Sequence, residues 1–162
     1  MPTACRRAFL VLVLILAGCV APGPPFASVA STIPPPPPGS ARIFLYRWLE
    51  PYETVAMTTA YFNGSAVGVT ETGTVLYRDV APGRYTISVW SEGVYPDQFK
   101  TVTVGPGQVV YARIESLSSW SVCGGFDVSM GGAAGCWDTF VVNIMDPAVA
   151  LSEMQSLRFI RG

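Results

Sequence analysis

Short runs of strand-forming residues, separated by turn residues, limit the fold of this sequence more than any other feature. After Gly39 these runs recur roughly every 8–12 residues, a spacing typical of all-β sandwiches. The expected strands cover residues 41–48, 57–62, 65–70, 74–80, 84–90, 99–104, 108–116 and 140–144. The sequence therefore predicts a mainly all-β domain, a small antiparallel β-sandwich of about seven to eight strands with one short C-terminal helix.

The turns between these runs have recognisable chemistry. Asn63-Gly64 is the strongest short-range hairpin signal, because both central residues of such a turn need positive φ. Ala81-Pro82-Gly83 suits a type II turn, and Gly105-Pro106-Gly107 a further turn. The strand after Pro82 alternates strictly. We therefore expect Tyr85, Ile87 and Val89 to face the core. In the first strand, Ile43 and Leu45 lie on one face and Phe44, Tyr46 and Trp48 on the other, so both faces should be at least partly covered.

The order of strands and turns over residues 41–116 resembles the PEGA and transthyretin-like β-sandwich domains, and a bacterial lipoprotein domain family of unknown function. The resemblance is carried by Asn63-Gly64, Ala66-Val67-Gly68, Val80, Pro82, Gly83, Tyr85, Ile87, Val89 and the strand onset from Gly107 to Tyr111. It implies a sandwich architecture and an envelope location. It implies no reaction.

The N-terminus has the three parts of an export signal: Arg6-Arg7, an apolar core from Ala8 to Leu16, and the small residues Ala17-Gly18. The apolar stretch from Ala8 to Ala21 is shorter than the ~20 residues that a membrane-spanning helix needs. Residues 1–18 are therefore expected to be a cleaved signal peptide.

Leu16-Ala17-Gly18-Cys19 resembles the lipobox of bacterial lipoproteins at all four positions. The resemblance implies that the Cys19 thiol receives a diacylglyceryl group, that the chain is cut before Cys19, and that the new amino group is acylated. Two or three acyl chains anchor a protein stably, whereas one holds it only marginally. Val20 follows the cysteine where aspartate would favour inner-membrane retention. The pattern thus implies an outer-membrane location, with the periplasmic or surface face left open.

Removal of the signal leaves eight basic and eleven acidic residues, so the mature chain should be mildly acidic. That balance argues against a nucleic-acid partner, which would favour a basic stripe.

Four cysteines occur in the sequence. Cys5 leaves with the signal and Cys19 is expected to carry lipid, so Cys123 and Cys136 remain. In an oxidising compartment this pair is most simply a disulfide, worth ~3 kcal/mol in the chain-entropy account. A zinc site is not expected, because the chain has no histidine and two thiolates do not complete a tetrahedral shell.

Residues 19–40 are rich in proline, and Pro34 to Pro38 are unbroken. Such a run favours the extended polyproline II conformation, so we expect an unpacked, semi-rigid tether that holds the domain off the membrane. A ligand for a proline-binding groove is the alternative. The sandwich domain itself is expected over residues 41–162.

Residues 117–139 interrupt the strand pattern with a glycine-rich insertion that the predicted disulfide would close. Further on, Asp146-Pro147 is a typical helix start. Apolar residues then follow at helical spacing, and we expect this helix to bury Leu151 and Met154.

Catalysis is not expected. The sequence has no histidine, no cysteine left free after processing, one lysine, no GxSxG motif and no phosphate-binding glycine loop followed by lysine. No catalytic residue, cofactor or metal is therefore predicted. Asp127 and Asp138 could act as paired carboxylates, but isolated acidic residues beside turns are usually solvated.

Two binding functions remain. The first, which we prefer, is a non-catalytic interaction or structural module that presents loops or a strand edge to another envelope protein. The alternative is a glycan- or peptidoglycan-binding module that uses Trp120, Trp137 and Tyr95 near the 123–136 loop, because exposed aromatic faces stack on sugar rings. Packing of the two tryptophans in the core or against the predicted disulfide is the competing interpretation.

Overall fold

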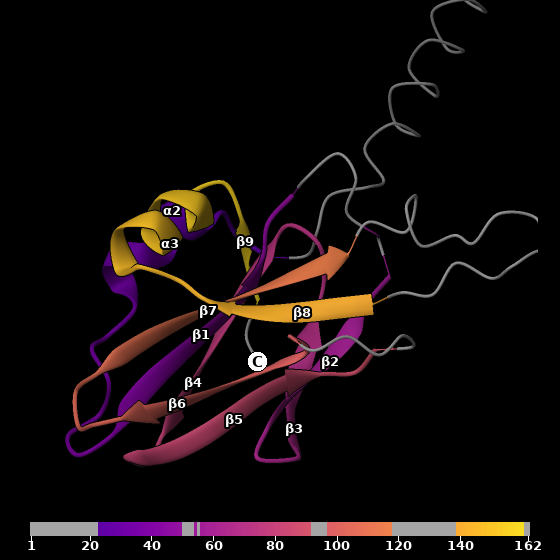
Figure 1. The fold of residues 1–162 in the computed structure, drawn as a ribbon. Coiled ribbons are helices and arrows are strands. Elements are labelled where there is room, and N and C mark those ends of the chain that lie inside the picture. The colour runs from indigo at the N-terminus through magenta and orange to yellow at the C-terminus, as the bar shows by residue number, and fades with distance from the viewer. Residues whose placement is uncertain (1–22, 50–53, 55, 92–96, 118–138, 161–162) are drawn as a thin grey trace, which may run out of the picture.

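A computed structural model describes residues 23–49, 54, 56–91, 97–117 and 139–160. In this part of the chain two β-sheets pack face to face, and two short α-helices cover the outer face of the larger sheet (Figure 1). The predicted β-sandwich is confirmed.

The larger sheet has the strand order β8-β7-β1-β4-β9 and the smaller sheet the order β3-β2-β5-β6. The strands of the larger sheet are β1 (Ala41–Arg47), β4 (Thr74–Val80), β7 (Val109–Leu117), β8 (Thr139–Ile144) and β9 (Arg158–Phe159). Those of the smaller sheet are β2 (Thr58–Phe62), β3 (Ser65–Thr70), β5 (Gly83–Val89) and β6 (Phe99–Val104). The smaller sheet is antiparallel throughout, as predicted, whereas the larger sheet is mixed, because β1 pairs in parallel with β7, and β4 with β9.

The predicted turns connect strands in two ways: one joins neighbouring strands of a sheet, and the others join the two sheets. Asn63 and Gly64 have φ of 50° and 81° and join β2 to β3, so the predicted hairpin is confirmed. The Gly105–Gly107 turn, where Gly107 has φ of 74°, instead carries the chain from one sheet to the other. The connection at Pro82 also changes sheet, because β4 lies in the larger sheet and β5 in the smaller. It is a bend between sheets, and Gly83 already belongs to β5.

Two apolar clusters explain why every residue of β1 is buried. Ile43 and Leu45 face the cluster between the two sheets, together with Ile87. Phe44 and Tyr46 face a second cluster between the larger sheet and the helices. Both faces of β1 are covered, as predicted. Ile87 and Val89 are buried and Tyr85 packs partly buried against the first cluster, which confirms the inward face of β5.

Residues 23–34, here called the strap, are packed on the domain, so the prediction of an unpacked tether is wrong for this segment. They contain α2 (Phe26–Val29) and the 3-10 helix η1 (Ala30–Thr32). Phe26 is 2% exposed and meets Phe44 edge to face, with 6.1 Å between ring centroids. The Phe26 amide donates to the Leu157 carbonyl oxygen at 2.8 Å. The strap is therefore part of the domain, and it leads into the Pro34–Pro38 run that was expected to hold the domain away from the membrane.

The C-terminal helix α3 (Pro147–Met154) begins as predicted, because Asp146 Oδ1 accepts from the Ala148 amide at 2.8 Å. Its buried residues are Ala150 and Met154, whereas Leu151 is 41% exposed. The prediction for Leu151 is therefore wrong. Residues four apart share one helix face, and Leu151 lies about 100° away from Ala150. In the described residues no helix combines the length and the apolarity that a membrane crossing requires.

Candidate functional site

The site residues predicted from the sequence lie outside the described residues. These are Cys19, Tyr95, Trp120, Cys123, Cys136 and Trp137. Lipidation, disulfide pairing and glycan stacking therefore stay predictions. The described residues that flank these stretches in the sequence are Gly23, Ser91, Asp97, Leu117 and Thr139.

A groove of about 1200 Å³ lies between the strap and the adjoining strands β3, β4 and β9. Val69, Leu76 and Phe159 supply apolar parts of its wall, and Glu71 and Arg78 supply charged parts. This composition suits a ligand or chain segment with apolar and polar groups.

Gly23 fixes one wall of the groove by allowing a close approach of two backbones. It has φ of 107°, and a Cβ atom built there would lie 2.1 Å from the Phe159 carbonyl oxygen. Next to it, the Phe159 amide donates to the Pro24 carbonyl oxygen at 2.8 Å. Only glycine fits this position, so the strap and β9 are held together from the first described residue.

Arg42 fixes the other end of the strap. Its Nε and one terminal nitrogen donate to the two carboxylate oxygens of Asp79, at 2.6 and 2.9 Å, and its other terminal nitrogen donates to the Pro34 carbonyl oxygen at 2.6 Å. The guanidinium also lies 3.9 Å from the centroid of the Tyr77 ring. Every nitrogen of this 3% exposed side chain is therefore committed to holding the strap and β4.

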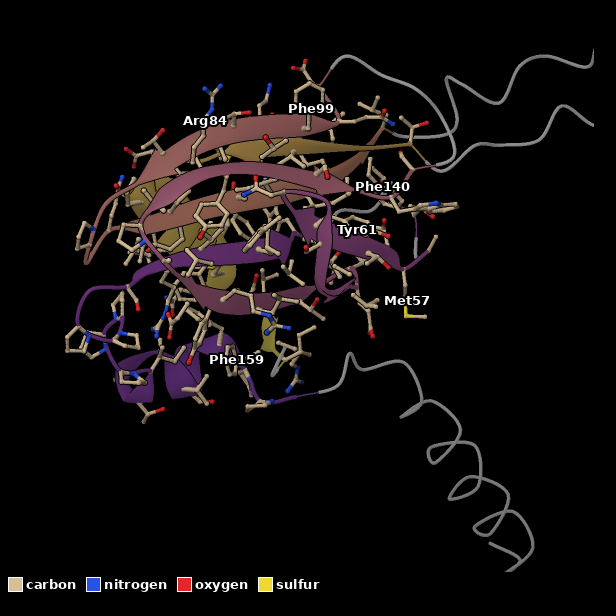
Figure 2. All side chains as sticks on the ribbon, turned by 90° about the horizontal axis from the view of Figure 1, so that it is seen from below. Met57, Tyr61, Arg84, Phe99, Phe140 and Phe159 are labelled. Atoms are coloured by element: carbon tan, nitrogen blue, oxygen red, sulfur yellow. The ribbon has the colours of Figure 1, made fainter. Side chains whose placement is uncertain are left out.

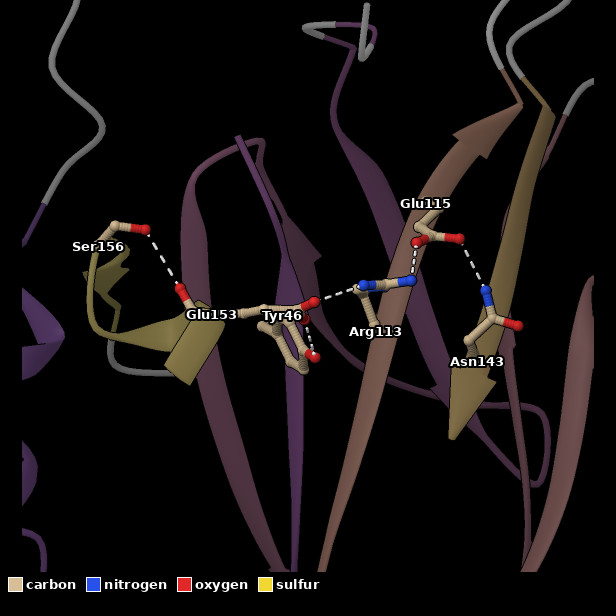
Figure 3. A network of polar contacts seen from close by, with 6 residues as sticks. All are labelled: Tyr46, Arg113, Glu115, Asn143, Glu153 and Ser156. Atoms are coloured by element: carbon tan, nitrogen blue, oxygen red, sulfur yellow. Dashed lines mark hydrogen bonds and ion pairs between the residues drawn. The ribbon is translucent and has the colours of Figure 1, made fainter. Parts of the chain in front are cut away.

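A second polar cluster joins α3 to the larger sheet (Figure 3). The Glu153 carboxylate accepts from the Tyr46 hydroxyl and from an Arg113 terminal nitrogen, each at 2.6 Å. The other terminal nitrogen of Arg113 pairs with Glu115, which also accepts from the Asn143 side-chain amide at 2.8 Å. The Glu153 carboxylate thus links β1 and β7 to α3.

The electrostatics of this cluster suit a structural role. The pKa of Tyr46 is raised mainly by burial, and the hydrogen bond to Glu153 raises this pKa further. The Tyr46 side chain is fully buried, so its hydroxyl stays protonated at neutral pH and donates permanently to Glu153. Burial also raises the pKa of Tyr111. A phenol in this state is a poor nucleophile or base.

Metal ligands do not gather in the described residues, where no group of three or more His, Cys, Asp or Glu side chains could hold an ion. The charged side chains that converge there instead bond to each other or to backbone carbonyls. We found no family model, curated protein or solved structure that matches the chain.

Neither the two polar clusters nor the groove is predictable from the sequence pattern. The signal that the pattern offers is the presence of Arg42 and Arg113 inside strand patterns, where a charge must find a partner if the strand is buried. The partners Asp79 and Glu153 lie 37 and 40 residues away in the chain, so the pattern alone could not pair them.

Proposed function

We propose that this chain is a lipid-anchored protein of the bacterial cell envelope, acylated at Cys19 and held in the outer membrane. In this proposal its β-sandwich is a non-catalytic interaction or structural module. The lipobox and the lack of histidine in the sequence motivate the proposal.

One structural observation carries the non-catalytic part. Two groups of ionisable side chains in the described residues, Arg42 with Asp79 and Arg113 with Glu115 and Glu153, each bond within their own cluster. An active site needs groups that are free to act on a substrate. These groups are instead engaged in holding the strap and α3 on the larger sheet.

The sheet edges support a partner that binds by strand addition. β3 and β6 form the two edges of the smaller sheet. Exposed residues alternate with more buried ones along β6. A strand added at this edge would form hydrogen bonds with the β6 backbone and contact the exposed β6 side chains on one face.

Anchoring is tested by Cys19→Ser in cells fed with labelled palmitate. We expect the variant to lose the label, and to leave the membrane fraction or keep its signal peptide. Cys5→Ser is the matched control, because Cys5 lies in the predicted signal outside the lipobox and should leave labelling unchanged. Equal labelling of wild type and Cys19→Ser would refute the anchor.

The interaction module is tested by photo-crosslinking in intact cells. A crosslinking residue replaces Ala66 on β3 or Thr103 on β6, which are exposed, and Ser152 on α3 serves as the control position. We expect at least one edge to yield a discrete protein adduct that Ser152 does not. If neither edge yields one, the strand-addition mode fails.

The glycan-binding alternative stays a prediction, since Tyr95, Trp120 and Trp137 lie outside the described residues. Co-sedimentation of the mature protein with purified peptidoglycan tests it. Binding that is lost when Trp120 and Trp137 are replaced by alanine would favour this alternative over the protein partner.

A further inference from the structure

The consecutive prolines from Pro34 to Pro38, here called the proline ridge, were expected to act as a spacer between the anchor and the domain. A spacer needs a segment that is free on at least one side. The strap packs on the larger sheet directly before the ridge, and β1 begins at Ala41 shortly after it. The ridge therefore lies between two packed segments and adds no length to a tether while the strap stays in place.

Hydrogen bonds fix the ridge at both ends. A terminal nitrogen of Arg42 donates to the Pro34 carbonyl oxygen at 2.6 Å. At the other end the Ser40 amide donates to the Pro37 carbonyl oxygen at 2.9 Å, and the Gly107 amide donates to the Ser40 carbonyl oxygen at 2.7 Å. These bonds tie the ridge to β1 and to the turn between β6 and β7. All of these residues belong to the described chain, and they make the ridge a fixed part of its surface.

The burial of the ridge repeats every three residues, as in a polyproline II helix. A residue that precedes proline is restricted to extended conformations, which applies to the whole stretch from Ile33 to Pro37. Ile33 has φ of −70° and ψ of 116°, within this region. Ile33 and Pro36, three residues apart, are half-buried. The exposed prolines are Pro34, Pro35, Pro37 and Pro38. One face of the ridge thus lies on the domain, and the other two faces point to solvent.

The exposed faces offer a partner apolar rings and hydrogen-bond acceptors. In Figure 1 and Figure 2 the indigo segment between the strap and β1 runs along the margin of the molecule. Proline has no N–H group, so its backbone can only accept hydrogen bonds. Within the described residues, the carbonyl oxygens of Pro35, Pro36 and Pro38 accept none. The ridge itself carries no charged side chain. A complementary surface therefore combines flat apolar groups with hydrogen-bond donors.

From these observations we propose that the proline ridge is a docking element for a protein partner with an aromatic-lined groove. Tryptophan and tyrosine suit such a groove, because their rings pack against proline rings three residues apart while their N–H and O–H groups donate to the carbonyl oxygens. The domain already holds the ridge extended, so binding orders little additional backbone. The inference rests on the proposed interaction module and gives it a contact surface separate from the sheet edges.

The test uses the full protein in intact cells, with a photo-crosslinking residue in place of Thr32, which is exposed two residues before the ridge. We expect a discrete protein adduct whose yield falls at least fivefold in the Pro35→Ala/Pro38→Ala variant. The matched control is Pro106→Ala, which changes an exposed proline outside the ridge and should leave the yield unchanged. In membranes isolated from the same cells, excess oligoproline peptide should abolish the adduct, whereas a glycine-serine peptide of equal length should not.

Urea denaturation separates binding from folding, because the Pro35→Ala/Pro38→Ala variant should unfold at the same urea concentration as wild type. A fall in this midpoint together with the adduct would show that the prolines only stiffen the domain, and would overturn the proposal. Equal yields in the variant and the control, or an adduct that oligoproline does not displace, would also overturn it. Adducts from Ala66 or Thr103 with none from Thr32 would reject the ridge and keep the interaction module. No adduct from any of the three positions would reject both.

Discussion

The Arg42 guanidinium holds both carboxylate oxygens of Asp79, at 2.6 and 2.9 Å, and at the same time the carbonyl oxygen of Pro34. Arg42 is 3% exposed and Asp79 28% exposed, so the ion pair is shielded on one side only. The pair links β1 to β4, and the third bond links β1 to the strap. A proline-rich segment that looks like a linker is thus fastened to the domain by a strand residue.

Arg42→Met should destabilise the protein by about 2 kcal/mol. The expected loss is smaller than the ~3–5 kcal/mol that breaking a fully buried ion pair costs, because the Asp79 carboxylate keeps part of its hydration. Urea denaturation of the mature protein measures the change. The control is Arg84→Met, which changes an exposed arginine and should shift stability by less than about 0.5 kcal/mol. Equal effects of the two substitutions would contradict the clamp.

Phe26→Ala should release the strap. Phe26 is buried against Phe44, and loss of a buried phenylalanine costs about 3–5 kcal/mol when the site cannot collapse. The strap can detach, so we expect a lower cost together with much faster proteolysis within residues 23–40. Val149→Ala, at an exposed apolar position on α3, is the control. A strap that resists protease equally in both variants would mean that Phe26 does not hold it.

Glu153→Gln should loosen α3, because the Tyr46 hydroxyl and Arg113 would lose their shared charged acceptor. Hydrogen bonds to charged groups contribute roughly 1.5–3 kcal/mol, and we expect a loss within this range. Hydrogen exchange of residues 147–154 should accelerate, whereas the exposed control Ser152→Ala should leave it unchanged. Unchanged exchange in Glu153→Gln would show that packing of Ala150 and Met154 alone holds the helix.

Stability should fall above about pH 10. The pKa of Tyr46 is raised in the folded state, so above the ordinary tyrosine pKa of ~10 the folded protein binds more protons than the unfolded chain. Each such group lowers the free energy of unfolding by up to ~1.4 kcal/mol per pH unit over this window. In urea denaturation series from pH 8 to 11, the free energy of unfolding should decline less steeply with pH for Tyr46→Phe than for wild type. Tyr111→Phe should also reduce the slope, because burial raises the pKa of Tyr111. Parallel slopes in all three proteins would exclude this linkage.

The mature protein should contain no free thiol if Cys19 is acylated and Cys123 pairs with Cys136. Thiol titration of the denatured, unreduced protein checks this pairing. Two reactive thiols would leave the loop open and remove the expected ~3 kcal/mol of chain-entropy stabilisation.

Local chemistry made parts of this fold predictable from the sequence. The Asn63-Gly64 hairpin depends on two residues that adopt positive φ, and the start of α3 depends on the carboxylate of Asp146 and the ring of Pro147. The alternation in β5 marks its buried face because side chains of a strand point to opposite faces in turn. In each case the residues that decide the structure are neighbours in the chain.

Tertiary structure decided the rest. Phe26 belongs to the core only because Phe44, far along the chain, offers it a partner, and Leu151 is exposed because the larger sheet meets α3 on the face of Ala150 and Met154. The same holds for the parallel pairing of β1 with β7. The sequence by itself determined turns, strands and an expected anchor. Which surfaces meet depends on contacts between distant segments, and their free energy appears only when the whole domain packs.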